Sequence, residues 1–70
     1  MQYFVTKPSK KDPASLRVIR KFDDYETARN WASRYIFPDD HRLFIDDSVG
    51  NRLGIVEYND PDPIVTEFNN

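Results

Sequence analysis

The clearest alternation of apolar and polar positions in this chain lies between residues 23 and 36. The apolar and aromatic positions of this segment are Tyr25, Ala28, Ala32, Tyr35 and Ile36. Their spacing of i, i+3, i+7, i+10 and i+11 places them on one side of an α-helix. The pattern therefore predicts one amphipathic helix, with Ala32 at its contact with the rest of the protein.

Both ends of this predicted helix carry residues that commonly delimit helices. Asp23 precedes it and Glu26 follows three residues later, which predicts an acidic capping pair at the N-terminus. Pro38 follows the helix, and the residue before a proline is disfavoured in the helical conformation. We therefore expect the helix to begin after Asp23 and to end before Pro38.

The segments on both sides of the helix are rich in β-branched and aromatic residues, which favour strands. Four strands are predicted, at residues 2–6, 16–22, 41–45 and 52–58. The basic loop 7–15 joins the first two as an antiparallel pair. The loop 46–51 joins the last two as a hairpin, because Asp, Ser, Gly and Asn favour turns. Gly54 inside the fourth strand predicts a bulge or the close approach of another group.

One helix covers one face of one sheet. We therefore predict a single α+β domain over residues 1–70. Its architecture is a small two-layer ββαββ fold, in which a mainly antiparallel four-stranded sheet carries one helix on one face. Residues 61–70 form either a short fifth strand at the sheet edge or a docked tail, and the last two Asn residues fray. The strand order is left open, because the pattern does not say which hairpins pair.

The alternation within the strands also predicts which residues lie on each face of the sheet. Those expected to face the helix are Leu16, Val18, Phe22, Leu43, Ile45, Leu53 and Ile55. Those expected on the opposite face are Phe44, Val56 and Tyr58, beside Phe4 or Tyr3. An open aromatic face is a surface on which a partner, or a second copy of the chain, can bind. The alternatives are scattered surface apolar residues or a cover formed by the C-terminal tail.

Composition narrows the classes of function. The chain has 70 residues, no cysteine and a formal net charge of −2. Disulfides and thiolate metal sites are therefore excluded. No apolar run approaches the roughly 20 residues that a membrane-spanning helix needs, and the first residues lack the pattern of a signal peptide. We expect a soluble, cytoplasmic protein that does not engage a membrane.

The charges are distributed unevenly along the chain. Residues 1–34 contain eight Lys or Arg and four acids, whereas residues 35–70 contain two Arg and eight acids, so the halves carry +4 and −6. We expect one acidic end at the second hairpin, formed by Asp46, Asp47, Glu57, Asp60 and Asp62. It serves either as a docking surface or only as a set of turns that favour Asp. If this end is a docking surface, we expect that changing Asp46 and Asp47 to Lys weakens binding to the partner and leaves the stability of the protein unchanged.

Few residues are placed to carry out chemistry. The acidic pairs, Asp60-x-Asp62 included, lack the converging ligands that a divalent ion needs, and Asp46-x-Ser48-x-Gly50 lacks the closing Glu of a calcium loop. His41, the sole histidine, follows two Asp, but no second catalytic group can be placed beside it. We therefore expect it at the surface, at the start of the third strand. We predict no catalytic, metal or cofactor-binding residues and no enzyme activity.

Two functions from different classes remain. The first is a small non-enzymatic protein-binding module, an inhibitor or adaptor of the kind that phages and mobile elements encode. It would meet an electropositive partner through the acidic residues together with Phe44, Tyr58 and Trp31. Trp31, on the flank of the helix stripe, serves either as such an anchor or as the edge of the core beside Tyr35.

The alternative is a nucleic-acid-binding domain that uses the basic N-terminal half. Its phosphate-binding residues would be Lys7, Lys10, Lys11, Arg17, Arg20 and Lys21. Tyr3 and Phe4 would stack on bases. The sequence pI of about 5.2 argues against this alternative. A homodimer through the open sheet face is a third expectation.

Overall fold

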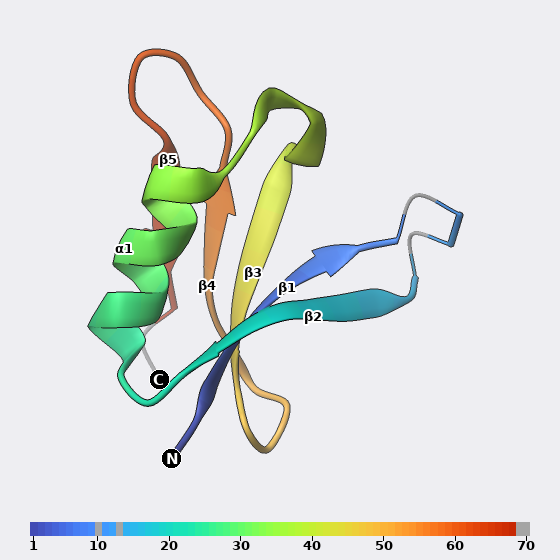
Figure 1. Cartoon of the computed structure of the whole chain (residues 1–70), viewed down its shortest axis with the longest axis vertical. Helices are drawn as coiled ribbons and strands as arrows, with labels where there is room; N and C mark the ends of the chain where they lie inside the picture. Colours follow the sequence, from blue (N-terminus) through green and yellow to red (C-terminus); the bar gives the residue numbers. More distant parts are fainter. Residues whose placement is uncertain (10, 13, 69–70) are drawn as a thin grey trace.

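In the described part of the chain, five strands form one antiparallel sheet, and a single helix packs on one face of it (Figure 1). This architecture is seen in a computed structural model that describes residues 1–9, 11–12 and 14–68. The elements are β1 (Tyr3–Pro8), β2 (Leu16–Phe22), α1 (Tyr25–Tyr35), a 3-10 turn (Pro38–Asp40), β3 (Arg42–Asp47), β4 (Arg52–Glu57) and β5 (Ile64–Glu67). The strand order is β2-β1-β3-β4-β5. The predicted α+β fold is confirmed, and residues 64–67 form a fifth strand on β4.

The N-terminal cap of the helix lies one residue later than predicted, and α1 begins at Tyr25. Asp24, and not Asp23, is the N-cap, because its extended backbone lets its carboxylate accept a hydrogen bond from the Thr27 amide at 3.0 Å. At the other end, Ile36 leaves the helical conformation two residues before Pro38. The fraying expected of Asn69 and Asn70 lies outside the described residues.

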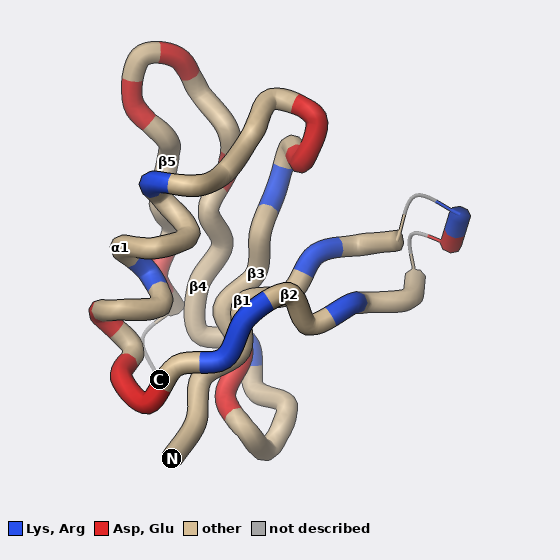
Figure 2. The backbone as a smooth tube through the Cα atoms, in the orientation of Figure 1, with Lys and Arg blue, Asp and Glu red and all other residues tan. Residues whose placement is uncertain are grey.

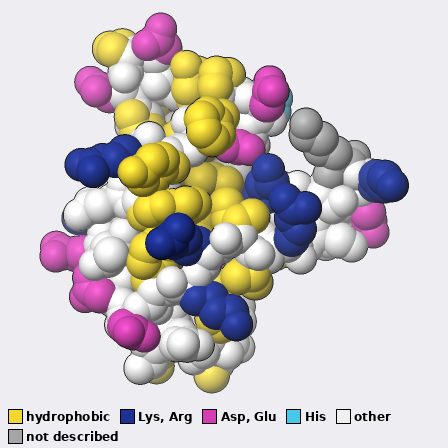
Figure 3. Space-filling view, viewed as in Figure 1, with side chains coloured by type: hydrophobic (Ala, Val, Ile, Leu, Met, Phe, Trp, Pro, Cys, Tyr) yellow, Lys and Arg dark blue, Asp and Glu magenta, His cyan; other side chains and the backbone are white. Residues whose placement is uncertain are grey.

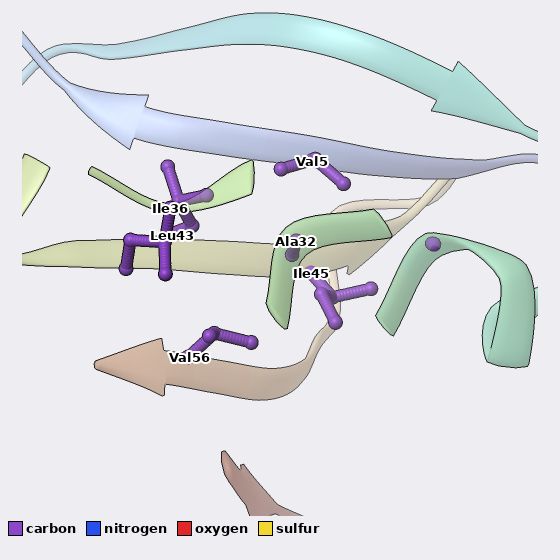
Figure 4. Packing of buried hydrophobic residues seen from close by; sticks show 7 residues of the cluster. Val5, Ala32, Ile36, Leu43, Ile45 and Val56 are labelled. Atoms are coloured by element: carbon purple, nitrogen blue, oxygen red, sulfur yellow. The ribbon is translucent and has the colours of Figure 1, made fainter. Parts of the chain in front are cut away.

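The core lies between α1 and the middle of the sheet. Its fully or nearly fully buried residues are Val5, Ala28, Ala32, Ile36, Leu43, Ile45 and Val56, most of which Figure 4 labels. Ala28 and Ala32 are the only buried residues within α1, and neither exposes any surface. The stripe predicted for the helix is therefore confirmed at both positions, whereas Tyr35 at its end is 48% exposed.

The faces of β4 differ from the predicted ones. Leu43 pairs with Val56 and Ile45 pairs with Gly54, so Val56 and Gly54 face the helix, and Ile55 joins Phe44 on the open face. The predictions that Val56 lies on the open face and Ile55 in the core are wrong. Side chains alternate along a strand, so an error of one residue in the alignment exchanges the two faces.

A bulge in the β1–β2 pair changes the faces of β2 in the same way. Val5 pairs with Arg20 and Thr6 pairs with Val18, which leaves Ile19 as an extra residue. Phe22 faces the helix as predicted and contacts Trp31. Val18 pairs with Thr6, which pairs with Phe44, so Val18 lies on the open face with these two residues. Leu16 and Val18 are 46% and 45% exposed, so the prediction that they meet the helix is wrong.

The open face carries Phe4 and Phe44, as predicted, but cations cover both rings. The guanidinium of Arg52 lies 3.8 Å from the centre of the Phe44 ring, and Phe44 is only 8% exposed. Asp46 holds this guanidinium in place, with 3.1 Å between Arg52 Nε and Asp46 Oδ1. The Lys21 ammonium lies 5.6 Å from the Phe4 ring. This face therefore presents less aromatic surface than the sequence suggests.

The predicted close approach at Gly54 is confirmed. A Cβ atom at this position would lie 2.9 Å from the Tyr25 hydroxyl and 3.3 Å from the carbonyl oxygen of Thr66. The Tyr25 hydroxyl donates a hydrogen bond to Glu67 Oε2 at 2.8 Å, and Arg29 also contacts Glu67. The side chains of α1 thus fasten β5 to the helix across a position where only a glycine leaves room.

The first prediction concerns the helix–sheet contact. Changing Ala32 to Asp should lower the free energy of unfolding by about 2 kcal/mol or more, because the new carboxylate is buried without a partner. Asn30 is exposed on the same helix, so Asn30→Asp should change the free energy of unfolding by less than about 0.5 kcal/mol. Urea unfolding followed by circular dichroism measures both. Equal losses would show that the helix packs in a different rotation.

The second prediction concerns Tyr25. Burial, together with the hydrogen bond to Glu67 and the charge of Glu67, raises the pKa of Tyr25 from 10.0 to about 12. The unfolded chain therefore loses this proton at a lower pH than the folded protein, so folding stability falls as the pH rises from about 10 to 12. Urea midpoints should decrease less over this range in Tyr25→Phe than in the parent. Parallel decreases would place the hydroxyl in solvent.

Candidate functional site

Asp46 and Asp47 are largely buried, and both carboxylates accept hydrogen bonds from neighbouring groups. Asp46 binds the Thr6 hydroxyl and Arg52. Asp47 accepts hydrogen bonds from the backbone amides of Val49 and Asn51 and thereby closes the β3–β4 loop. These hydrogen bonds, led by the Asn51 amide, lower the pKa of Asp47 although burial opposes them.

The other predicted acidic residues lie at the opposite end of the sheet (Figure 2). Glu57 is the last residue of β4, and Asp60 and Asp62 follow in the connection to β5. A six-residue strand at about 3.3 Å per residue separates them from the β3–β4 loop by roughly 20 Å. The single acidic end expected from the sequence is therefore not formed. Tyr58 directly follows Glu57 at the same end of the sheet as Asp60 and Asp62, and it is 40% exposed.

The predicted basic residues are also divided between surfaces. Lys7, Lys11 and Arg17 line a hollow of about 430 Å³ at the start of the β1–β2 loop. Lys7 is already paired with Asp40, with 3.2 Å between nitrogen and oxygen. Lys21 lies on the open face and Arg20 on the helix side, and Lys10 lies outside the described residues. Among the described residues of this set, Lys7, Arg17 and Arg20 thus share the helix side of the sheet, and Lys21 lies on the opposite face.

One group of side chains does converge on the helix side of the sheet, between α1 and β2. Phe22, Trp31 and Tyr35 form a row, with ring centres 5.8 Å and 5.4 Å apart. The Arg20 guanidinium lies 5.7 Å from the Phe22 ring and 5.6 Å from the Trp31 ring. We call these four residues and Arg34 the arginine–aromatic face. They border or line a shallow hollow of about 320 Å³, to which Thr27 and Asn30 also contribute.

The arginines of this face have no acidic partner in the described part of the chain. The ion pairs found there join Lys7 to Asp40, Arg29 to Glu26 and Glu67, and Arg52 to Asp46. Arg20 and Arg34, together with the neighbouring Arg17, are absent from these pairs and are exposed. Figure 3 shows hydrophobic side chains gathered on this side of the molecule, with Lys and Arg side chains lying over and around them.

Local structure explains why this face forms. Arg20 and Phe22 lie two residues apart on β2 and therefore share its helix side, and the alanines of α1 bring its flank residues Trp31 and Tyr35 close to β2. Trp31 packs against Tyr35 at the edge of the core, as one of the two sequence interpretations predicts. Alternation along β2 places Arg20 on the same side as Phe22, which the sequence predicts to face the helix. Its contact with Trp31 also depends on where α1 lies across the sheet, and the pattern does not specify that. A further sequence signal is that Trp31 and Arg34 share a helix flank.

The remaining candidates carry backbone roles or none. His41 is exposed before β3, adopts a left-handed φ of 57°, and its carbonyl oxygen accepts a hydrogen bond from the Tyr58 amide. Among residues 1–9, 11–12 and 14–68, no group of three or more His, Asp or Glu residues could hold a metal ion. No helix within the same ranges is long and apolar enough to cross a membrane.

Comparisons with known proteins leave the function to be inferred from these residues. No family model, curated protein or solved structure matches the chain. The arginine–aromatic face is therefore the candidate site because of its geometry: a row of partly exposed aromatic side chains, arginines without acidic partners among the described residues, and a hollow between two elements.

The third prediction tests the structural role of Asp47. Its carboxylate stabilises the fold above the normal pKa of 3.8, and this contribution is lost as the pH falls through the lowered pKa of the folded state. Asp47→Asn should therefore lower the urea midpoint at pH 7, and its difference from the parent should shrink at pH 2. The exposed Asp39→Asn serves as the control. Equal urea midpoints of Asp47→Asn and Asp39→Asn at pH 7 would contradict the structural role assigned to the Asp47 carboxylate.

Proposed function

We propose that this protein is a small non-enzymatic protein-binding module that binds an acidic segment of another protein at its arginine–aromatic face. Such a module acts as an inhibitor when it covers the partner's own site and as an adaptor when it links two partners. The proposal keeps the protein-binding class that the sequence favours. It moves the binding surface from the acidic residues, which the fold divides, to the arginines that lie between α1 and β2.

The observation that carries the proposal is the position of Arg20. Its guanidinium is held against the rings of Phe22 and Trp31, where cation–π contacts orient it without neutralising its charge. A planar guanidinium that is fixed in this way is suited to bind a carboxylate through two hydrogen bonds. Because no carboxylate of the described residues is paired with it, an incoming acidic side chain can take that position.

The aromatic residues supply the other component of a binding surface. Trp, Tyr and Arg are the residue types that contribute most binding energy at protein interfaces. Tyr35 is 48% exposed, and Phe37, two residues further along the chain, is 64% exposed. Covering this apolar surface would stabilise a complex, and a carboxylate at Arg20 would fix the orientation of the bound segment.

A nucleic acid is the less suitable ligand for this face. Trp31 already packs against Phe22, Tyr35 and Arg20, so less of its ring is free to stack on a base. Asp23, Asp24 and Glu26 also lie at the start of α1, directly after Phe22, where they would repel a phosphate backbone. An acidic peptide carries its charges singly and can place them at the arginines alone.

The fourth prediction follows from this assignment. Selection of a random twelve-residue peptide library on the immobilised protein should enrich acidic sequences that contain aliphatic or aromatic residues. Arg20→Ala should weaken the selected peptides by about tenfold or more, since a charge-assisted contact is lost. Arg42→Ala, an exposed arginine on β3, should leave the affinity unchanged. The quenching or blue shift of Trp31, the sole tryptophan, reports binding at this face.

Two results would contradict the proposal. One is a library without acidic enrichment. The other is a twelve-nucleotide single strand that binds more tightly than any selected peptide and loses affinity in Arg20→Ala, which would favour the nucleic-acid alternative. Thermal unfolding of each variant shows whether the loss of binding is separate from a loss of folding.

A further inference from the structure

The arginine–aromatic face lies beside an unpaired edge of the sheet. β2 is the outermost strand and pairs only with β1, so the described chain leaves its other edge open (Figure 1). In an edge strand, every second residue directs its N–H and C=O groups away from its only partner. β2 is seven residues long, against four for β5 at the opposite edge. It is therefore the longer free template for another strand.

The side chains of β2 differ between its two sides. Arg20 and Phe22 lie on the helix side. Arg17 lies on the same side, because it pairs with Lys7, which is two residues from the partner of Arg20 on β1. On the open side lie Leu16 and Val18, which are 46% and 45% exposed. A strand laid beside β2 would place alternate residues next to each set, since side chains directly opposite one another lie about 5 Å apart.

We propose that the acidic segment binds by strand addition, as a sixth strand along the free edge of β2. The inference rests on the proposed function and specifies how the partner is recognised. The bound segment is extended and alternates acidic with aliphatic residues. Its acidic side chains lie beside Arg17 and Arg20, and its aliphatic side chains lie beside Leu16 and Val18. Backbone hydrogen bonds supply affinity, and this alternation supplies specificity.

A second copy of the chain fits this edge less well. Pairing two β2 strands would bring Arg17, Arg20 and Lys21 of one copy against the same residues of the other, and like charges across a strand pair are destabilising. Pairing β2 with β5 of another copy would bring Glu67 to the arginines, but Glu67 is already bound by Tyr25 and Arg29. The edge therefore suits an acidic strand from a different protein.

The fifth prediction uses a capped nine-residue peptide that alternates valine and glutamate as the probe. Its affinity for the full-length protein is followed by Trp31 fluorescence. Two further peptides carry N-methyl groups on the backbone nitrogens, one on all valines and the other on all glutamates. In an extended strand, each set of N–H groups points to one side. One methylated peptide should therefore lose at least about tenfold in affinity, and the other should bind like the parent peptide.

The protein variants and a second observable complete the test. Arg20→Ala should weaken the peptide by about tenfold or more, whereas Arg42→Ala should bind it as the parent does. Backbone amides of β2 should exchange more slowly with solvent in the complex. A peptide that alternates valine and lysine should not bind.

Four results would overturn strand addition. The first is that both methylated peptides bind equally well while Arg20→Ala still weakens binding. Binding would then depend on side-chain contacts alone, and the proposed function would be kept without strand addition. The second is that the valine–lysine peptide binds as tightly as the valine–glutamate peptide, which would show that the arginines do not select an acidic strand. A glutamate peptide that does not bind at millimolar concentration would also overturn it, and the library selection then decides the proposed function separately. Oligomers that grow with protein concentration and vanish in Arg20→Ala would assign the edge to a second copy.

Discussion

The close approach of α1 to the sheet is the constraint on which the rest of this structure depends. Ala28 and Ala32 are the only residues that the helix buries completely, and both have the smallest side chain with a Cβ atom. Small side chains let the helix backbone lie close to the sheet, where Leu43, Ile45 and Val56 supply the volume of the core. At the helix N-terminus the same approach brings Tyr25 over Gly54, so that Tyr25 reaches Glu67.

This approach also determines the candidate site. A helix with alanines at its centre contacts the sheet along a narrow stripe, so its larger flank residues extend beyond the core. Trp31 and Tyr35 therefore meet Phe22 at the edge of the sheet and remain partly exposed. The exposed aromatic surface is thus a consequence of how the core is packed. In a protein of 70 residues, one helix cannot cover the full width of a five-stranded sheet.

The sequence predicts the elements well because each depends on local chemistry. The period of the helix stripe and the composition of the strands identify α1 and the first four strands, and Gly54 correctly indicates a close contact. The fifth strand is one of two predicted alternatives for residues 61–70, and the 3-10 turn is not predicted. The faces of the strands are less predictable, because a bulge at Ile19 and another beside Asp46 shift the alternation by one residue. Those shifts depend on pairing between segments distant in sequence. They move Val56 into the core and turn Leu16 and Val18 away from the helix. Arg20 keeps the side that alternation with Phe22 gives it, but its contact with Trp31 depends on where α1 lies across the sheet, which the pattern does not specify.

The distribution of charge follows the same logic, because most acidic side chains near the folded elements have local structural partners. Asp24 caps the helix, Asp47 closes a loop, Asp46 orients Arg52, and Glu67 binds Tyr25 and Arg29. Each of these carboxylates is held by groups beside it, and none of them is paired with an arginine of the arginine–aromatic face. The arginines between α1 and β2 have no such partners among the described residues. A chain with a formal net charge of −2 can therefore present a cationic face, and the sign of the net charge does not identify the partner.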